Sequence, residues 1–177
     1  MVVLVVGIIS GVAMLSLNVG GGERYLREES DRLAALLEQA ANEAVMQNQE
    51  YGLKVTDKGY AFLCLDEAKQ RWKPCTNNSS FREREMPEGL VIHLLREGKM
   101  TIPLQADKEK ENSKSAGKDD EPRINPDVFL LSSGEASPAS LEIQVIEKPE
   151  LKSEIRIDEI GRVSREGEEP EDKKNAG

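Results

Sequence analysis

Histidine and cysteine are almost absent from this sequence. Its 177 residues include one histidine, His93, and two cysteines, Cys64 and Cys75. A histidine-rich metal site and a four-thiolate zinc site are therefore excluded within one chain, because their ligands are missing. His93 alternates with apolar residues, which is typical of a half-buried packing residue, and no nucleophile is identifiable near it. We expect no catalytic residues, no metal and no cofactor.

Aromatic residues and positive charge are also limited. Aromatic residues make up 4% of the chain, so the sequence predicts an aliphatic core. Acidic residues outnumber basic ones by 33 to 24, which gives a formal net charge of -9. Such a balance repels phosphate backbones and argues against general nucleic-acid binding.

Charge is entirely missing from the first 22 residues, which are nearly continuously apolar up to Val19. A helix of that length extends about 33 Å and can cross a hydrocarbon core of about 30 Å. A cleaved signal peptide would need a basic start and a small-residue cleavage site, which are not present, and a buried soluble helix is the other alternative. Residues 1–22 are predicted to be a transmembrane and assembly helix, in which Gly7 and Gly11 have small-xxx-small spacing.

Residues 23–50 are predicted to continue as an amphipathic helix. Apolar residues recur at steps of three, four or seven, and include Leu26, Leu33, Leu37 and Val45. These residues are expected to form the packing face of the helix. The glycines at 20–22 are expected to bend or locally melt the helix, because each is a poor helix former. The opposite face, which is mostly acidic, is expected to be solvated or to meet a basic partner.

From residue 51 the apolar period changes from helical spacing to two, which indicates strands. Together with the preceding helix, these strands predict an α+β domain over residues 51–164, with an antiparallel sheet or β-sandwich packed on the helix. Residues 105–127 are predicted to be a disordered loop and residues 165–177 a disordered acidic tail, because both are highly polar. The expected strands are 51–56, 59–65, a return near 71–75, 90–95, 100–104, 128–132, 140–146 and 153–158.

Cys64 and Cys75 flank a turn that we expect to be centred between Lys69 and Gln70. Symmetrical pairing about this turn would place the two cysteines opposite each other, where Cβ atoms lie about 4.5 to 5.5 Å apart. A disulfide is geometrically accessible there in an oxidising compartment, and two free thiols are equally compatible with the sequence.

Other polar motifs have simpler structural interpretations. Residues 132–135 (SSGE) are predicted to be a turn, because a nucleophile elbow needs G-x-S-x-G before a helix. The glycines at 20–22 lack the lysine of a phosphate-binding loop. Asp119, Asp120 and Glu121 lack the spacing of a calcium loop. No enzyme is indicated.

Four segments together resemble a known family. They are VVLVVGIISGVAMLSL, LREESDRLAALLEQAANEAVMQNQEYGLKV, GYAFLCLDEAKQRWKP and VFLLSSGEASPASLEI. The sequence is similar to the H-type minor pseudopilins of bacterial type II secretion systems, across most of residues 1–164. The most specific parts are EAVMQNQEYGL (43–53) and LLSSGEASP (130–138).

The resemblance implies a pilin-like fold and a single-pass inner-membrane protein whose globular domain faces the periplasm. It also implies assembly near the tip of a pseudopilus with other minor and major pseudopilins and the inner-membrane platform, in support of export of folded proteins. No small-molecule substrate or nucleic acid is implied.

The sequence departs from the family at its start. Members begin with a basic leader, a Gly-Phe cleavage point and a glutamate at the fifth mature position, and none of these is present before or within the apolar run. As written, the chain would not be processed and N-methylated as the family is. We expect the upstream DNA to encode Gly-Phe-Thr-Leu-Ile-Glu in frame, and an in-frame stop just before Met1 would contradict this.

The alternative is a minor pilin of type IV pili, some of which bind DNA through arginines near the C-terminus. Arg162 and Arg165 occupy such a place, but Glu159 and the glutamates at 166, 168 and 169 surround them. Phosphate attraction would be largely cancelled, so secretion is favoured.

Overall fold

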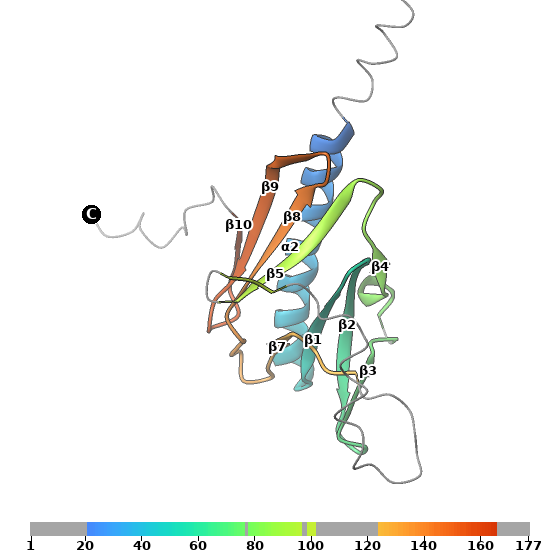
Figure 1. Cartoon of the computed structure of the whole chain (residues 1–177). Coiled ribbons are helices and arrows are strands. Elements are labelled where there is room, and N and C mark those ends of the chain that lie inside the picture. Colours follow the sequence, from blue (N-terminus) through green and yellow to red (C-terminus); the bar gives the residue numbers. More distant parts are fainter. Residues whose placement is uncertain (1–20, 77, 97–98, 102–123, 166–177) are drawn as a thin grey trace, which may run out of the picture.

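A computed structural model describes residues 21–76, 78–96, 99–101 and 124–165, with one long helix lying along two antiparallel sheets (Figure 1). The predicted α+β architecture is confirmed. Most of the expected membrane segment, including Gly7 and Gly11, lies outside the described residues, as does most of the 105–127 loop. Within the described part, no helix combines the length and apolarity needed to cross a bilayer.

Helix α2 runs from Gly21 to Gln47. The expected interruption at the glycines is wrong for Gly21 and Gly22, because both are helical. A Cβ at Gly22 would lie 3.3 Å from Val145 Cγ1, so the absence of a side chain permits close packing against the sheet. The helix ends three residues before the predicted boundary, in a Schellman motif. Asn48 has a φ of 51°, and the Gln49 amide donates to the Ala44 carbonyl over 3.1 Å.

The first sheet, sheet A, has strand order β3-β2-β1-β7, with β4 also paired to β2. The short helix η1 (Ser79–Phe81) lies between β3 and β4 in sequence. All pairings in sheet A are antiparallel. The strand bounds are β1 (Tyr51–Thr56), β2 (Gly59–Asp66), β3 (Arg71–Pro74), β4 (Arg84–Glu85) and β7 (Val128–Leu130).

The second sheet, sheet B, has strand order β10-β9-β8-β5-β6, also antiparallel. Strand β9 begins five residues earlier than predicted, and β4 and β10 were not predicted. Charged residues in β4 and at the start of β9 hide the apolar alternation that predicts a strand. Strand β10 is short and begins two residues after Gly161, whose φ of 71° is typical of a loop. The strand bounds are β5 (Leu90–Arg96), β6 (Lys99–Thr101), β8 (Ala139–Val145), β9 (Lys148–Ile157) and β10 (Val163–Arg165).

One continuous core joins α2 to both sheets. On sheet B it is aliphatic, as predicted, and contains residues such as Leu141, Ile143 and Ile155. On sheet A it is not, because aromatic residues are concentrated there. The rings of Phe62 and Phe81 have centroids 5.0 Å apart. The buried aromatic residues, here called the aromatic cluster, are Tyr51, Tyr60, Phe62 and Phe81.

The end of the predicted 105–127 loop is packed rather than free. Pro126 is buried on β1, where a Cβ at Gly52 would overlap it. The Asp127 amide donates to the Leu53 carbonyl over 2.8 Å, and its carboxylate accepts from the Val55 amide over 2.9 Å. Pro126 and Asp127 lie in a loop as predicted, but the expected disorder is wrong for them, because their partners lie in β1, distant in sequence. Arg165, assigned to the tail, belongs to β10.

Candidate assembly surface

The predicted packing face of the helix is divided between core and surface. Leu26, Leu33 and Leu37 are buried on the side of α2 that faces the core, whereas Val45 is 52% exposed. The placement of Val45 on the packed face is wrong, since it follows the buried Ala44 by one residue and is rotated by about 100° from it. The three leucines hold the helix to its own sheets.

The exposed side of the C-terminal half of α2 is polar and carries acids without bases. Its exposed residues include Ala35, Glu38, Asn42 and Met46, at steps of three or four residues. Met46 is 84% exposed. Together with Gln39, Glu43 and Gln47, these residues line a shallow surface depression along the helix. This stripe is exposed along the C-terminal half of α2.

Glu43 connects this helical face to sheet A. Its carboxylate accepts hydrogen bonds from Gln39 Nε2 over 2.8 Å and from Gln47 Nε2 over 3.1 Å on the helix itself. It also accepts from the Tyr51 hydroxyl over 3.3 Å and from Asn78 Nδ2 over 3.0 Å. Burial, followed by the charge of Glu43, raises the pKa of Tyr51. One carboxylate therefore ties α2 to β1 and to the segment before η1.

A disulfide joins Cys64 to Cys75 beside the Glu43 contacts, with Cα atoms 5.2 Å apart. The predicted register is wrong, because Cys64 lies opposite Lys73 rather than Cys75. Cys75 follows β3, and its amide donates to the Phe62 carbonyl over 3.0 Å. The disulfide therefore runs diagonally, and it fixes the residues after β3 under the C-terminal half of the helix.

The two sequence segments most specific to the resemblance meet at the end of α2. Glu50 accepts from the Ser132 hydroxyl over 2.8 Å and from the Ser132 amide over 3.1 Å. Val45 lies against Gly134, where an added Cβ would be 3.7 Å from Val45 Cγ2. Gly134 has a φ of 91°, so residues 132–135 form the predicted turn. The Ser132 hydroxyl has a structural role there.

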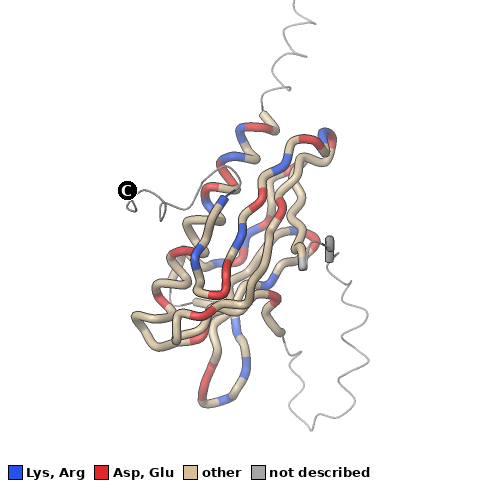
Figure 2. The backbone as a smooth tube through the Cα atoms, turned by 90° about the vertical axis from the view of Figure 1, so that its left-hand side faces the viewer, with Lys and Arg blue, Asp and Glu red and all other residues tan. Residues whose placement is uncertain are grey.

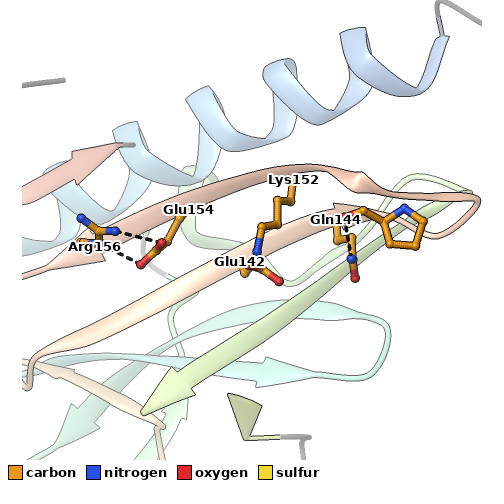
Figure 3. A network of polar contacts seen from close by, with 6 residues as sticks. Glu142, Gln144, Lys152, Glu154 and Arg156 are labelled. Atoms are coloured by element: carbon orange, nitrogen blue, oxygen red, sulfur yellow. Dashed lines mark hydrogen bonds and ion pairs between the residues drawn. The ribbon is translucent and has the colours of Figure 1, made fainter. Parts of the chain in front are cut away.

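A polar network covers the outer face of sheet B (Figure 3). Glu142 is only 5% exposed and accepts from Lys152 Nζ over 2.7 Å. His93 is half-buried and lies opposite Glu142 in the register, as expected of a packing residue. Arg156 donates to Glu154 over 2.8 and 3.0 Å, and this contact lowers the pKa of Glu154. The face is charge-compensated.

Neither a metal site nor a basic strip is evident in the described ranges. No group of three or more potential metal ligands occurs among these residues. Basic and acidic positions are interspersed over the described backbone, with short runs of one sign (Figure 2). Arg165 forms an ion pair with Asp31 of α2, so its charge is compensated within the domain.

Sequence reasoning missed Glu43, Glu50, Asp127 and Glu142. Glu43 bonds to Asn78 at a separation of 35 residues, and Glu50 bonds to Ser132 at a separation of 82. No local pattern reports partners this far away. The occurrence of Glu43 and Glu50 within the family-specific segment 43–53 was the one available signal.

Comparisons with known proteins agree with this geometry. The family model of type II transport protein GspH matches residues 29–161. Type II secretion system protein H of Pseudomonas aeruginosa is 34% identical over 142 residues, covering 80% of this chain and 76% of that protein. Its counterpart of the same name in Aeromonas hydrophila is 25% identical over 164 residues, covering 92% of this chain and 86% of that protein.

Solved structures share the fold. The crystal structure of the minor pseudopilin EpsH of Vibrio cholerae matches with a TM-score of 0.63 and 21% identity, covering 84% of this chain and 99% of that chain. The solution structure of Escherichia coli GspH matches with a TM-score of 0.55 and 20% identity, covering 81% and 88%. The predicted family is thus confirmed, and the chain belongs to the GspH family of type II transport proteins.

Proposed function

We propose that this protein is a minor pseudopilin subunit of a type II secretion system. The observation that carries the proposal is the GspH family match over residues 29–161, which covers most of α2 and every described strand except β10. The pilin-like arrangement of one helix on antiparallel sheets agrees with it. The protein acts as a structural subunit, and the proposal assigns it no catalytic step.

The apolar start of the chain and the folded domain have different roles in this proposal. Residues 1–22 anchor the protein as a single pass in the bacterial inner membrane, and the domain beyond them faces the periplasm. An apolar helix can leave lipid for an equally apolar bundle of partner helices at little hydrophobic cost. The anchor can therefore also act as the assembly helix of the filament.

The contacts of α2 explain how the domain would follow that helix. Leu33 and Leu37 are fully buried against the sheets, and Glu43 bonds the helix to β1 and to Asn78. The helix and both sheets would move together as one rigid body, because a close-packed core has low compressibility. The other minor and major pseudopilins are the partners of this unit, and we place it near the pseudopilus tip.

A type IV minor pilin that binds DNA is the second candidate. Its arginines would need unsatisfied positive charge, but Arg165 is paired with Asp31, and Arg162 lies in a turn that also contains the acidic residues Asp158 and Glu159. The acidic setting opposes phosphate binding. A salt-sensitive gel shift with double-stranded DNA would favour this candidate over secretion.

The proposal is tested by chemical crosslinking in the bacterium that encodes the chain. The full chain carries a C-terminal tag, is isolated from membranes, and its crosslinked partners are identified by mass spectrometry. The matched control lacks residues 1–22 and is exported to the periplasm by a cleavable signal. We expect type II pseudopilins with the full chain and few or none with the control. Recovery of type IV pilins alone, or of no pseudopilin, would contradict the proposal.

A further inference from the structure

The hairpin between β8 and β9 lies beside the first turn of α2 (Figure 1). Val145 packs on Gly22 with the close approach described above. Val145 pairs with Lys148 across the hairpin, so Ile146 and Glu147 form its tip. The Ile146 amide donates to the Gly89 carbonyl over 2.9 Å, which fixes the tip to the turn before β5. The tip is thus held in place by its packing on α2 and by its hydrogen bond to the turn before β5.

This end of the domain exposes apolar side chains. Ile146 is 59% exposed at the tip of the hairpin, and Tyr25 is 50% exposed in the first turns of the helix. The charges around them are mainly acidic: Glu23, Glu88 and Glu147 are exposed, Lys148 is partly exposed, and Arg24 is paired with Glu28 over 2.7 Å. A surface of this kind favours apolar insertion over attraction to either sign of charge.

The apolar run of the sequence ends very close to this surface. Val19 is the last residue of the run, and three residues separate it from Gly22. Three residues span at most about 11 Å, whatever their conformation. The polar interface of a bilayer is about 5 to 8 Å thick on each side. If residues 1–19 lie in lipid, Gly22 and the Val145 side chain packed on it lie close to the hydrocarbon edge, so the adjoining hairpin tip is within reach of the interface.

We propose that the β8–β9 hairpin tip is a lipid-contact site, in which Ile146 inserts at the headgroup boundary beside Tyr25. Tyrosine is favoured at this depth because its ring is apolar and its hydroxyl is polar. The contact is weak alone, but the anchor makes it intramolecular and so raises its effective concentration. It orients the domain on the membrane before assembly. This inference rests on the proposed membrane anchor.

The domain offers a matched control residue. Ile160 is also 59% exposed, but it lies in the loop after β9, at the other end of that strand from Ile146. Single variants Ile146→Cys and Ile160→Cys can be labelled selectively, because both native cysteines are in the disulfide. The probe is an environment-sensitive fluorophore, and the full chain is reconstituted in phosphatidylcholine vesicles.

The measurement is quenching by lipids that carry a nitroxide near the headgroup, compared with quenching by iodide in water. We expect the probe at residue 146 to be quenched several-fold more by the lipid nitroxide than the probe at residue 160, with the opposite order for iodide. Replacing part of the lipid with phosphatidylglycerol should not strengthen the lipid quenching at residue 146, because the contact is apolar and the surrounding charges are mainly acidic. Equal quenching at both positions would overturn the inference.

Two further outcomes are distinguishable. Vesicle flotation reports the anchor separately. If the chain floats while the probe at residue 146 stays accessible to iodide, the anchor stands and the lipid contact is wrong. If the chain does not float, the proposed anchor fails and this inference falls with it. Shielding of residue 146 only after other pseudopilins are added would identify a protein contact and overturn the lipid assignment.

Discussion

The two sheets hold the same helix in different ways. Sheet A contacts it through the aromatic cluster and the Glu43 hydrogen bonds, and the Cys64–Cys75 disulfide lies beside these hydrogen bonds. Sheet B contacts it through aliphatic side chains, and its ion pairs lie on the face away from the core. The helix is therefore fixed by specific directional contacts on one side and by non-directional apolar burial on the other.

This difference shows why average composition predicted only half of the core. The chain has seven aromatic residues, from three Phe, three Tyr and one Trp, and four of them are buried on sheet A. A low average fraction does not prevent local concentration. The aliphatic prediction holds on sheet B because alternating aliphatic residues are the signal that the prediction used.

The largest expected effect separates the two halves of the core. Phe81→Ala should lower the free energy of unfolding by about 3 to 5 kcal/mol, because Phe81 contacts both Phe62 and Tyr51 and leaves a cavity. Leu141→Ala on sheet B, which is also fully buried, should cost about 2 to 4 kcal/mol. Chemical denaturation of a fragment that begins at Gly21 measures both. A smaller loss for Phe81→Ala would contradict the special role of the aromatic cluster.

Removing the disulfide should weaken sheet A alone. The Cys64→Ser/Cys75→Ser double variant should lose about 2 to 3 kcal/mol, because the bond closes a short loop. Hydrogen exchange should rise in residues 71–81 and not in β8 or β9. A reducing agent should destabilise the wild type and leave the double variant unchanged. Unchanged stability of the double variant would contradict the account.

A smaller effect is expected from the ion pairs on sheet B. Lys152→Met leaves Glu142 buried with its main counter-charge removed, and should cost about 1 to 2 kcal/mol. Arg156→Met should cost less than about 1 kcal/mol, because the more exposed Glu154 can be solvated by water. Thermal denaturation compares the two variants. If Arg156→Met lost as much stability as Lys152→Met or more, burial of Glu142 would not be what decides how much its ion pair stabilises the fold.

The smallest effect at neutral pH is expected at Tyr60. Burial, and then the charge of Glu29, raises the pKa of Tyr60 to about 12. This stabilisation is complete below the unfolded-state pKa of about 10 and is lost as the pH rises towards 12. Tyr60→Phe should leave stability nearly unchanged at pH 7, because the buried hydroxyl has no hydrogen-bond partner among the described residues, and should reduce the alkaline loss. An unchanged alkaline profile would contradict the assignment.

Local sequence patterns predicted the fold well where the structure of a segment depends on its own residues. The strand Tyr51–Thr56 was predicted with its observed bounds, because apolar alternation is clear there. The cysteine register was predicted wrongly, because the turn sets it. The Lys69 amide bonds to Asp66, Gln70 has a φ of 49°, and Arg71 pairs with Asp66. The spacing of two cysteines contains no information on that geometry.

The candidate surface was less predictable than the fold. Leu33 and Leu37 follow the helical period and were found from it, whereas Val45 fits the period loosely and lies outside the core. Glu43 and Glu50 act through distant partners, Asn78 and Ser132. Their role depends on how the sheets fold back on the helix, which no local pattern of charges specifies.

The central claim is that the chain supports secretion as a pseudopilin, and secretion itself is the most direct measurement. The gene is deleted in the bacterium that encodes it, and a type II exported enzyme is assayed in the medium and in the periplasm. We predict that the enzyme accumulates in the periplasm and that the full chain restores its release, whereas the chain lacking residues 1–22 does not. Normal release from the deletion strain, or full restoration by the truncated chain, would contradict the account.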